Sequence, residues 1–128
     1  MIRYDLCTLT LFQEPQVHMH FHATLPIMHG LVEKMVEDFV TAAPRLLGRQ
    51  VNMGEVMYEV AGRMGFGEGL YDPNFFLISP GHATAHLMVA RESIGLIELY
   101  RFSNEPFTAA QTRMLSTLAN QVALALRN

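Results

Sequence analysis

The C-terminal stretch of the chain constrains the fold most strongly, because its apolar residues recur at helical spacing almost to the last residue. Thr108 and Gln111 form a T-x-x-Q capping box, which predicts where a helix begins. A helix with one apolar side is stable in water only when that side packs on another layer. The apolar positions of this predicted helix are Met114, Leu115, Leu118, Val122, Ala125 and Leu126.

Two segments near the N-terminus have the composition and the period of β-strands. Residues 3–12 are rich in β-branched, aromatic and aliphatic side chains, and a polar break with a proline follows at residues 13–16. In residues 17–22, three apolar side chains alternate strictly with three histidines. That two-residue period is typical of a strand with two different faces. We expect these two strands to form a hairpin.

Two helices are predicted in the middle of the chain. Apolar and charged residues over 31–40 follow the helical period, and Pro44 is expected to end this helix. A second helix is predicted over residues 55–64, with Asn52 and Glu55 as a capping box at its start. A small ligand, if the domain binds one, is expected between the sheet and the helical excursion of residues 27–74.

Three further strand-like runs precede the last helix, at residues 75–79, 83–90 and 94–102. The breaks between them are short enough for antiparallel hairpins. The element order therefore predicts an α+β fold, with an antiparallel sheet of five to six strands flanked by helices. No linker or low-complexity stretch divides the chain, so we expect a single domain over residues 1–128.

Composition limits the classes of function. Half of the 128 residues are hydrophobic and 16% are charged, which suits a packed core, and the net charge of −3 comes with no basic stripe for nucleic acid. Cys7 is the sole cysteine, so an intrachain disulfide and multi-thiolate zinc sites are excluded. No apolar run is long enough for a membrane span or a signal peptide. We expect a cytoplasmic protein that binds neither nucleic acid nor membrane.

Residues 91–128 resemble the C-terminal portion of a GAF domain. In that family a hairpin turn leads to an I-G-x-L-x-L-Y-like strand, then a polar loop, then a closing helix that begins F-[ST]-x-x-[DEQ]. Residues 67–75 also contain the G-E-G-L and D-P-x-F patterns that are similar to the family's. The matching positions in the last third are Ile94, Gly95, Leu96, Leu99, Tyr100, Phe107, Thr108, Gln111, Met114, Leu115, Leu118, Ala119, Gln121, Val122, Ala123, Ala125 and Leu126.

The resemblance implies a GAF- and PAS-like (profilin-like) fold and a regulatory, non-catalytic role. The expected function is the input domain of a bacterial signal-transduction protein, such as a two-component system, that senses a small molecule, mediates dimerisation, or does both. Its output domain would be covalently linked or separate. GAF domains usually begin with a helix, whereas this chain starts almost directly on a strand.

Two specialised ligands of the family are not supported by these residues. Cyclic-nucleotide-binding members carry an N-K…F-x-x-x-D-E pattern, but here Phe107 and three further residues are followed by Gln111 and Thr112 in place of the two acids. Bilin-binding members attach the chromophore through a cysteine beside a histidine, and Cys7 has no such neighbour. No bilin attachment is expected, and these residues identify no cofactor. We also find no catalytic residue, because no nucleophile lies in a recognisable setting.

The histidines support an alternative function, a metal or haem sensor. Neutral imidazole is the commonest ligand of transition metals. His18, His20 and His22 share a strand face, and His82 and His86 are expected to point the same way from another strand. The competing interpretation is a polar pocket or a solvated face, because the spacing matches no closed zinc pattern. The candidate ligand-binding residues are His18, His20, His22, His82, His86, Met88, Glu98 and Tyr100.

Glu98 stands out because it interrupts an otherwise apolar strand. Its burial would require a partner such as His86, Arg101 or a ligand group.

The closing helix has an apolar face that is wide enough to pack on the sheet and to leave a stripe for a second copy. We expect a homodimer through this helix, and a ligand-free structural dimerisation domain is the remaining alternative. The predicted dimer residues are Met114, Leu118, Gln121, Val122 and Ala125.

Overall fold

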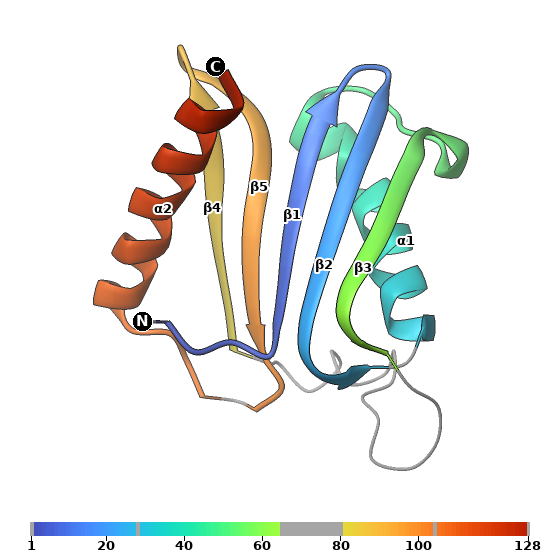
Figure 1. The fold of residues 1–128 in the computed structure, drawn as a ribbon. Coiled ribbons are helices and arrows are strands. Elements are labelled where there is room, and N and C mark those ends of the chain that lie inside the picture. Colours follow the sequence, from blue (N-terminus) through green and yellow to red (C-terminus); the bar gives the residue numbers. More distant parts are fainter. Residues whose placement is uncertain (1, 28, 65–80, 104, 128) are drawn as a thin grey trace.

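A computed structural model of the chain describes residues 2–27, 29–64, 81–103 and 105–127. In this part of the chain five strands form one sheet, and two long helices flank it (Figure 1). The predicted α+β class is confirmed. The predicted strand over residues 75–79 and the family-like patterns at 67–75 lie outside the described residues. The elements are β1 (Leu6–Gln13), β2 (Gln16–Ile27), α1 (His29–Leu47), the 3-10 turn η1 (Met53–Glu55), β3 (Val56–Met64), β4 (Gly81–Val89), β5 (Glu92–Arg101) and α2 (Ala109–Arg127).

The sheet has the strand order β3-β2-β1-β5-β4 and is mostly antiparallel. The predicted β1–β2 hairpin is confirmed, and β4 and β5 form a second hairpin. The expectation of an entirely antiparallel sheet is wrong at one edge, where β3 runs parallel to β2. The physical reason is α1, which returns the chain from the end of β2 to the level where β2 began, so that β3 starts in the same direction.

Residues 56–64 form the strand β3, so the helix predicted over residues 55–64 is wrong. Asn52 and Glu55 do contact each other, and the Asn52 N–H donates to Glu55 Oε1 at 3.0 Å, but they cap only the single turn η1. Val56 and Val60 also fit a two-residue period, and they lie beside Val17 and Phe21 of β2 in the core. Both a helical and a two-residue period fit these residues. Pairing with the free edge of β2 and the preference of valine for strands selected the strand.

Helix α1 continues past Pro44 to Leu47, so the expectation that Pro44 ends the helix is also wrong. Proline lacks only one N–H, and here it lies in the last turn, where few bonds remain to be lost. The helix ends at Gly48, which has a φ of +72° and donates its N–H to the Pro44 carbonyl at 3.0 Å. The predicted apolar side of the helix is confirmed for five residues, whereas Val40 is only partly buried. The buried residues are Leu31, Val32, Met35, Val36, Phe39 and Ala43.

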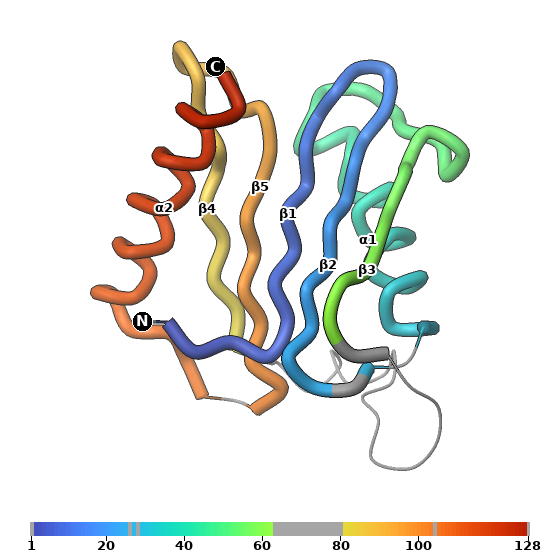
Figure 2. The backbone as a smooth tube through the Cα atoms, in the orientation of Figure 1, coloured from blue at the N-terminus to red at the C-terminus, as the bar shows by residue number. Residues whose placement is uncertain are grey.

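The two helices cover opposite faces and opposite halves of the sheet. Figure 2 shows α1 behind β2 and β3, whereas α2 lies beside β4 at the other edge. Each helix therefore has its own core, and half of each sheet face has no helix on it. In the described residues neither helix is long and apolar enough to cross a membrane. The core of α2 consists of Leu115, Ala119 and Ala123 packed on Ala83, Ala85, Leu87, Ile97 and Leu99.

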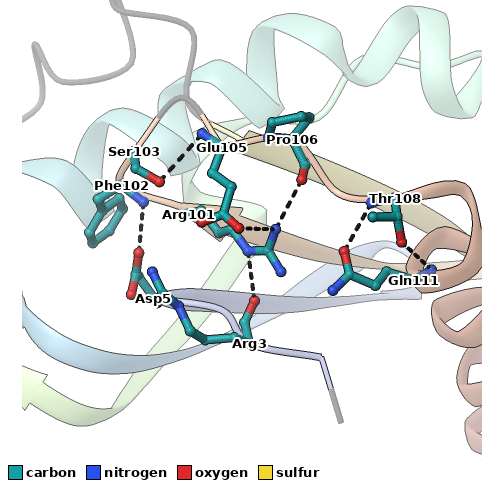
Figure 3. A network of polar contacts seen from close by, with 9 residues as sticks. All are labelled: Arg3, Asp5, Arg101, Phe102, Ser103, Glu105, Pro106, Thr108 and Gln111. Carbon is teal, nitrogen blue, oxygen red and sulfur yellow. Dashed lines mark hydrogen bonds and ion pairs between the residues drawn. The ribbon is translucent and has the colours of Figure 1, made fainter.

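The connection from β5 to α2 is held by a buried arginine (Figure 3). Arg101 is 3% exposed, and its guanidinium donates to the carbonyls of Arg3 and Pro106, both at 3.0 Å. The same guanidinium lies over the Phe107 ring, 4.0 Å from its centroid. One side chain thus joins the N-terminal segment, the end of β5 and the approach to α2.

The predicted start of α2 is confirmed in both of its hydrogen bonds. The Thr108 N–H donates to Gln111 Oε1 at 2.9 Å, and the Gln111 N–H donates to Thr108 Oγ1 at 3.1 Å (Figure 3). These reciprocal bonds satisfy backbone donors that the first turn of a helix leaves unpaired.

Candidate functional site

A pocket of about 470 Å³ lies between α1 and the half of the sheet that α1 leaves uncovered. Its volume falls in the range of about 300–1,000 Å³ that is usual for small-molecule sites. The polar lining residues come from β1, β4, β5 and the outer edge of α1. The lining consists of Thr8, Met19, Met35, Asp38, Phe39, Ala42, Arg45, Leu46, His82, Thr84, His86, Leu96, Glu98 and Tyr100.

Strand β4 places its polar residues in this pocket by simple alternation. Ala83, Ala85 and Leu87 are buried under α2, so the intervening side chains point to the other face. His82 and His86 are two of these, and both line the pocket. The same strand therefore carries the packing surface of α2 on one face and a polar wall of the pocket on the other.

Glu98 is the centre of the polar wall. Its carboxylate oxygen Oε2 accepts a hydrogen bond from His82 Nε2 at 2.8 Å and another from the Tyr100 hydroxyl at 3.0 Å. An ionised carboxylate only accepts, so Nε2 is the protonated nitrogen of this imidazole. Thr84 Oγ1 lies 2.9 Å from the same nitrogen. The Glu98 side chain is only 21% exposed, and the two hydrogen-bond donors offset the cost of burying its carboxylate.

The partners of Glu98 differ from those that the sequence suggested. His86 instead makes a hydrogen bond from Nδ1 to Ser93 Oγ at 3.0 Å, and Arg101 points to the opposite face, where it binds backbone carbonyls. His82 takes their place because the β4–β5 register sets it directly opposite Tyr100, two residues along β4 from Thr84, which lies opposite Glu98 on the same face.

Tyr100 is a fixed hydrogen-bond donor in this group. Burial raises the pKa of its phenol well above the usual value, and the negative charge of Glu98 and the hydrogen bond to it raise that pKa further. The phenol is therefore neutral at physiological pH, and its hydrogen is held by the carboxylate. Its ring stacks on the imidazole of His82, with centroids 4.6 Å apart.

Thr8 lies opposite Glu98 across β1 and β5, and it lines the floor of the pocket. Among the described residues, the buried hydroxyls of Thr8 and Thr10 have no hydrogen-bond partner. A threonine hydroxyl that is buried without a partner has an unmet hydrogen-bonding need. Sequence reasoning missed Thr8, because a threonine is common in a strand and its alternation with Cys7 and Leu9 does not by itself show which face is buried.

The three histidines of β2 share one face, as predicted, but it is the face opposite the pocket. The prediction that His82 and His86 point the same way as them is wrong. His20 pairs with Leu9, Leu9 pairs with Ile97, and Ile97 pairs with Ala85 of β4, so the alanines share the histidines' face. The register through β1 and β5 therefore puts His18, His20 and His22 on one face of the sheet and His82 and His86 on the other.

Two histidines of the opposite face have partners of their own. His20 Nδ1 lies 2.7 Å from Glu59 Oε1, and His22 Nδ1 lies 3.1 Å from the Tyr4 hydroxyl. In the described ranges no group of three His, Cys, Asp or Glu side chains could hold one metal ion. The metal or haem alternative therefore has no assembled set of ligands in that part of the chain.

The remaining candidate residues divide in the same way. Met88 does not line the pocket and is 42% exposed, next to an irregularity in the β4–β5 pairing. Four of the predicted ligand-binding residues thus meet in the pocket: His82, His86, Glu98 and Tyr100. The α1 residues of the pocket were missed because Asp38 and Arg45 read as ordinary solvated positions beside the apolar stripe of the helix.

The predicted dimer residues lie mainly on the exposed side of α2. Met114 and Leu118 are 48% and 47% exposed, and Gln121 and Ala125 are exposed too. Val122 differs, because it is half-buried against the core of α2. The helix therefore packs through one stripe and presents a second apolar stripe to its surroundings.

Cys7 lies on the α2 face of β1, partly buried. Burial raises the pKa of its thiol to about 11. The thiol is protonated at neutral pH and is a weak nucleophile, because the thiolate is the reactive form.

The whole chain was compared with known proteins. A family model described as a GAF domain matches residues 5–128, which includes the N-terminal two-thirds, where the resemblance in the sequence is loose. Comparisons with curated proteins and with solved structures each found no match. The family model spans nearly the full length of the chain, and the fold is a mainly antiparallel five-stranded sheet between two helices. The chain therefore belongs to the GAF domain family.

Proposed function

We propose that this domain is the small-molecule input module of a bacterial cytoplasmic signalling protein, and that its ligand binds between α1 and strands β4 and β5. Family membership supports a regulatory, small-molecule-binding or signalling role. The observation that carries the proposal is the pocket of about 470 Å³, with the half-buried Glu98, His82 and Tyr100 group on its wall. Apolar walls with a few convergent polar groups are typical of ligand sites.

The proposed mechanism is a population shift that passes through β4. A ligand can change the balance of two conformations only if it contacts them differently. His82, Thr84 and His86 contact the pocket, while Ala83 and Ala85 contact α2 from the same strand. A change in the position or twist of β4 on binding would therefore reach α2 without any intermediate element.

The output is proposed to pass through a homodimer formed by α2. Met114, Leu118, Gln121 and Ala125 are spaced four, three and four residues apart, which is the spacing of a two-helix seam. Their exposure supports this role. The output domain, in a two-component system for example, would be covalently linked to this domain or separate from it.

A ligand-free dimerisation domain is the second candidate, and the exposed stripe on α2 favours it equally. It differs in requiring that the pocket be closed by its own side chains. Met19, Met35 and Phe39 do line the pocket, but a volume of about 470 Å³ stays open beside them. That open volume supports the sensor over the structural alternative.

The test is a thermal-shift screen of the purified protein with a metabolite library, repeated with Ala42→Trp. Ala42 lines the pocket on α1, and an indole there would fill it. A ligand at about a hundred times its Kd stabilises a protein by about 2.7 kcal/mol. We expect at least one metabolite to stabilise the natural protein and to have no effect on the tryptophan variant.

Ala110→Trp is the matched control, because Ala110 is exposed on α2, away from the pocket. It should respond to the same metabolite as the natural protein does. A library without any stabilising compound, or one whose compounds act equally on Ala42→Trp, would support the structural alternative instead.

A further inference from the structure

The polar wall of the pocket has an unused hydrogen-bond acceptor, the second oxygen of Glu98. His82 and Tyr100 both donate to Oε2 of Glu98, and no described residue donates to its second oxygen, Oε1. A carboxylate can accept about four hydrogen bonds through its two oxygens. Glu98 is only 21% exposed, so bulk water satisfies this oxygen incompletely. A donor brought by the ligand would meet the strongest acceptor in the pocket.

A second polar group lies beside this acceptor. Thr8 and Glu98 are directly opposite in the β1–β5 pairing, which sets their Cβ atoms roughly 4.5–5.5 Å apart on the same face. The Thr8 side chain is 1% exposed, and its hydroxyl has no partner among the described residues. A ligand group with several N–H donors could therefore reach the carboxylate and the hydroxyl together.

The charges and walls of the pocket favour a cation at this position. The least exposed acid or arginine of the lining is Glu98, whereas Asp38 and Arg45 are exposed positions of α1. An anion placed beside Glu98 would lie against a half-buried carboxylate, which is unfavourable. The lining also includes Met19, Met35 and Phe39, whose apolar side chains suit the hydrocarbon part of an amphipathic cation.

We propose that the ligand class is a small amphipathic organic cation, an amine or amidine, whose protonated nitrogen binds Glu98 and Thr8. Its apolar part lies against Met19, Met35 and Phe39. This inference rests on the proposed function, because it names the chemistry recognised by the same pocket.

The first test uses compounds that share an apolar body and differ in one polar group. 2-Phenylethylamine, 2-phenylethanol and 3-phenylpropionate form one such set, and hexylamine, hexanol and heptanoate form another. Binding is followed by the shifts of backbone amide resonances of β4 and β5 in NMR titrations. We expect each amine to bind at least about tenfold more tightly than its alcohol, with the acid weakest, because a charge-assisted hydrogen bond is worth that much.

The second test identifies the anchor. Glu98→Gln keeps the size of the side chain and removes its charge, and it should weaken amine binding about 10- to 100-fold while leaving the alcohols nearly unchanged. Thr8→Val removes only the hydroxyl and should weaken amine binding about three- to tenfold. Glu59→Gln is the matched control, because Glu59 contacts His20 at 2.7 Å on the opposite face of the sheet. That variant should bind amines as the natural protein does.

The outcomes separate this inference from the proposed function. If the acids or alcohols bind in the pocket at least as tightly as the amines, the proposed cationic ligand class is wrong, but the proposed sensor function is not contradicted. The cation is equally wrong if no amine shifts the β4 and β5 resonances at millimolar concentration, or if Glu98→Gln leaves amine binding unchanged. The sensor itself fails only when the metabolite screen also shows no stabilisation that depends on the pocket. Because the compound series needs no variant, the test does not depend on whether Glu98→Gln folds.

Discussion

His82 stacks on Tyr100 across β4 and β5, with ring centroids 4.6 Å apart and planes within 4° of parallel, and both side chains donate to the same oxygen of Glu98. The stack fixes the direction of both donors, because neither ring can rotate without losing its neighbour. A carboxylate held from one side in this way leaves its other side to the pocket. This is the arrangement expected of a preformed polar anchor in a ligand site.

Removal of one donor should show how much the group contributes to stability. Tyr100→Phe deletes the hydroxyl that donates to Glu98 at 3.0 Å, and we expect a loss of about 1.5–3 kcal/mol in the free energy of unfolding, because the acceptor is charged. Urea denaturation measures it. Tyr58→Phe is the control, since Tyr58 is 40% exposed, and it should change stability by less than about 0.5 kcal/mol. Equal effects of the two variants would mean that the Glu98 group is not a stabilising unit.

The buried arginine at the start of α2 should matter more for stability than its charge alone suggests. Arg101→Met would leave the carbonyls of Arg3 and Pro106 without their donor, and we expect a loss of about 3 kcal/mol or more. Arg101→Lys should recover only part of it, because an ammonium lacks the planar fork that serves two acceptors. Arg113→Met, at an exposed position of α2, should be nearly neutral by the same denaturation assay. A neutral Arg101→Met variant would contradict the role of this contact.

The proposed dimer has a matched pair of test substitutions on one helix. Leu118→Glu adds a charge to the exposed stripe, and it should weaken the dimer at least about tenfold, as measured by sedimentation equilibrium. Leu124 is more exposed, at 60%, but lies on another side of α2, so Leu124→Glu should remain dimeric. A natural protein that is monomeric at high micromolar concentration would exclude this interface.

Cys7 gives the domain a specific sensitivity to alkaline pH. Its folded-state pKa of about 11 is above the usual value of 9.0, so the folded protein keeps a proton that the unfolded chain loses. This contribution to stability is complete below pH 9 and is lost as the pH rises from 9 to 11. Cys7→Ala should show a smaller fall in unfolding free energy over that window. An identical pH profile for the two proteins would show that the thiol is not held in its protonated form.

Several local features could be predicted from the sequence because neighbouring residues determine them. The alternation of three apolar residues with His18, His20 and His22 makes a strand with two faces wherever that strand lies. The reciprocal bonds of Thr108 and Gln111 need only one helical turn. Glu98 was recognisable as a functional candidate because a carboxylate within an apolar strand needs partners, whichever they are.

Other features depended on contacts between distant residues. Val56 and Val60 fit a helix or a strand equally well in sequence, and pairing with β2 selected the strand. The continuation of α1 past Pro44 depended on the helix end at Gly48. In each case the local preference was weak, and tertiary contacts outweighed it.

The sequence by itself therefore determined the two faces of β2, the start of α2, and the acidic character of the site. Only the tertiary structure decided which strand faces coincide, and so it separated His20 from His82 and brought His82 to Glu98. The physical reason is that the alternation of side chains is a property of one strand, whereas the register between strands is set by turns, hydrogen-bond ladders and the packing of both cores.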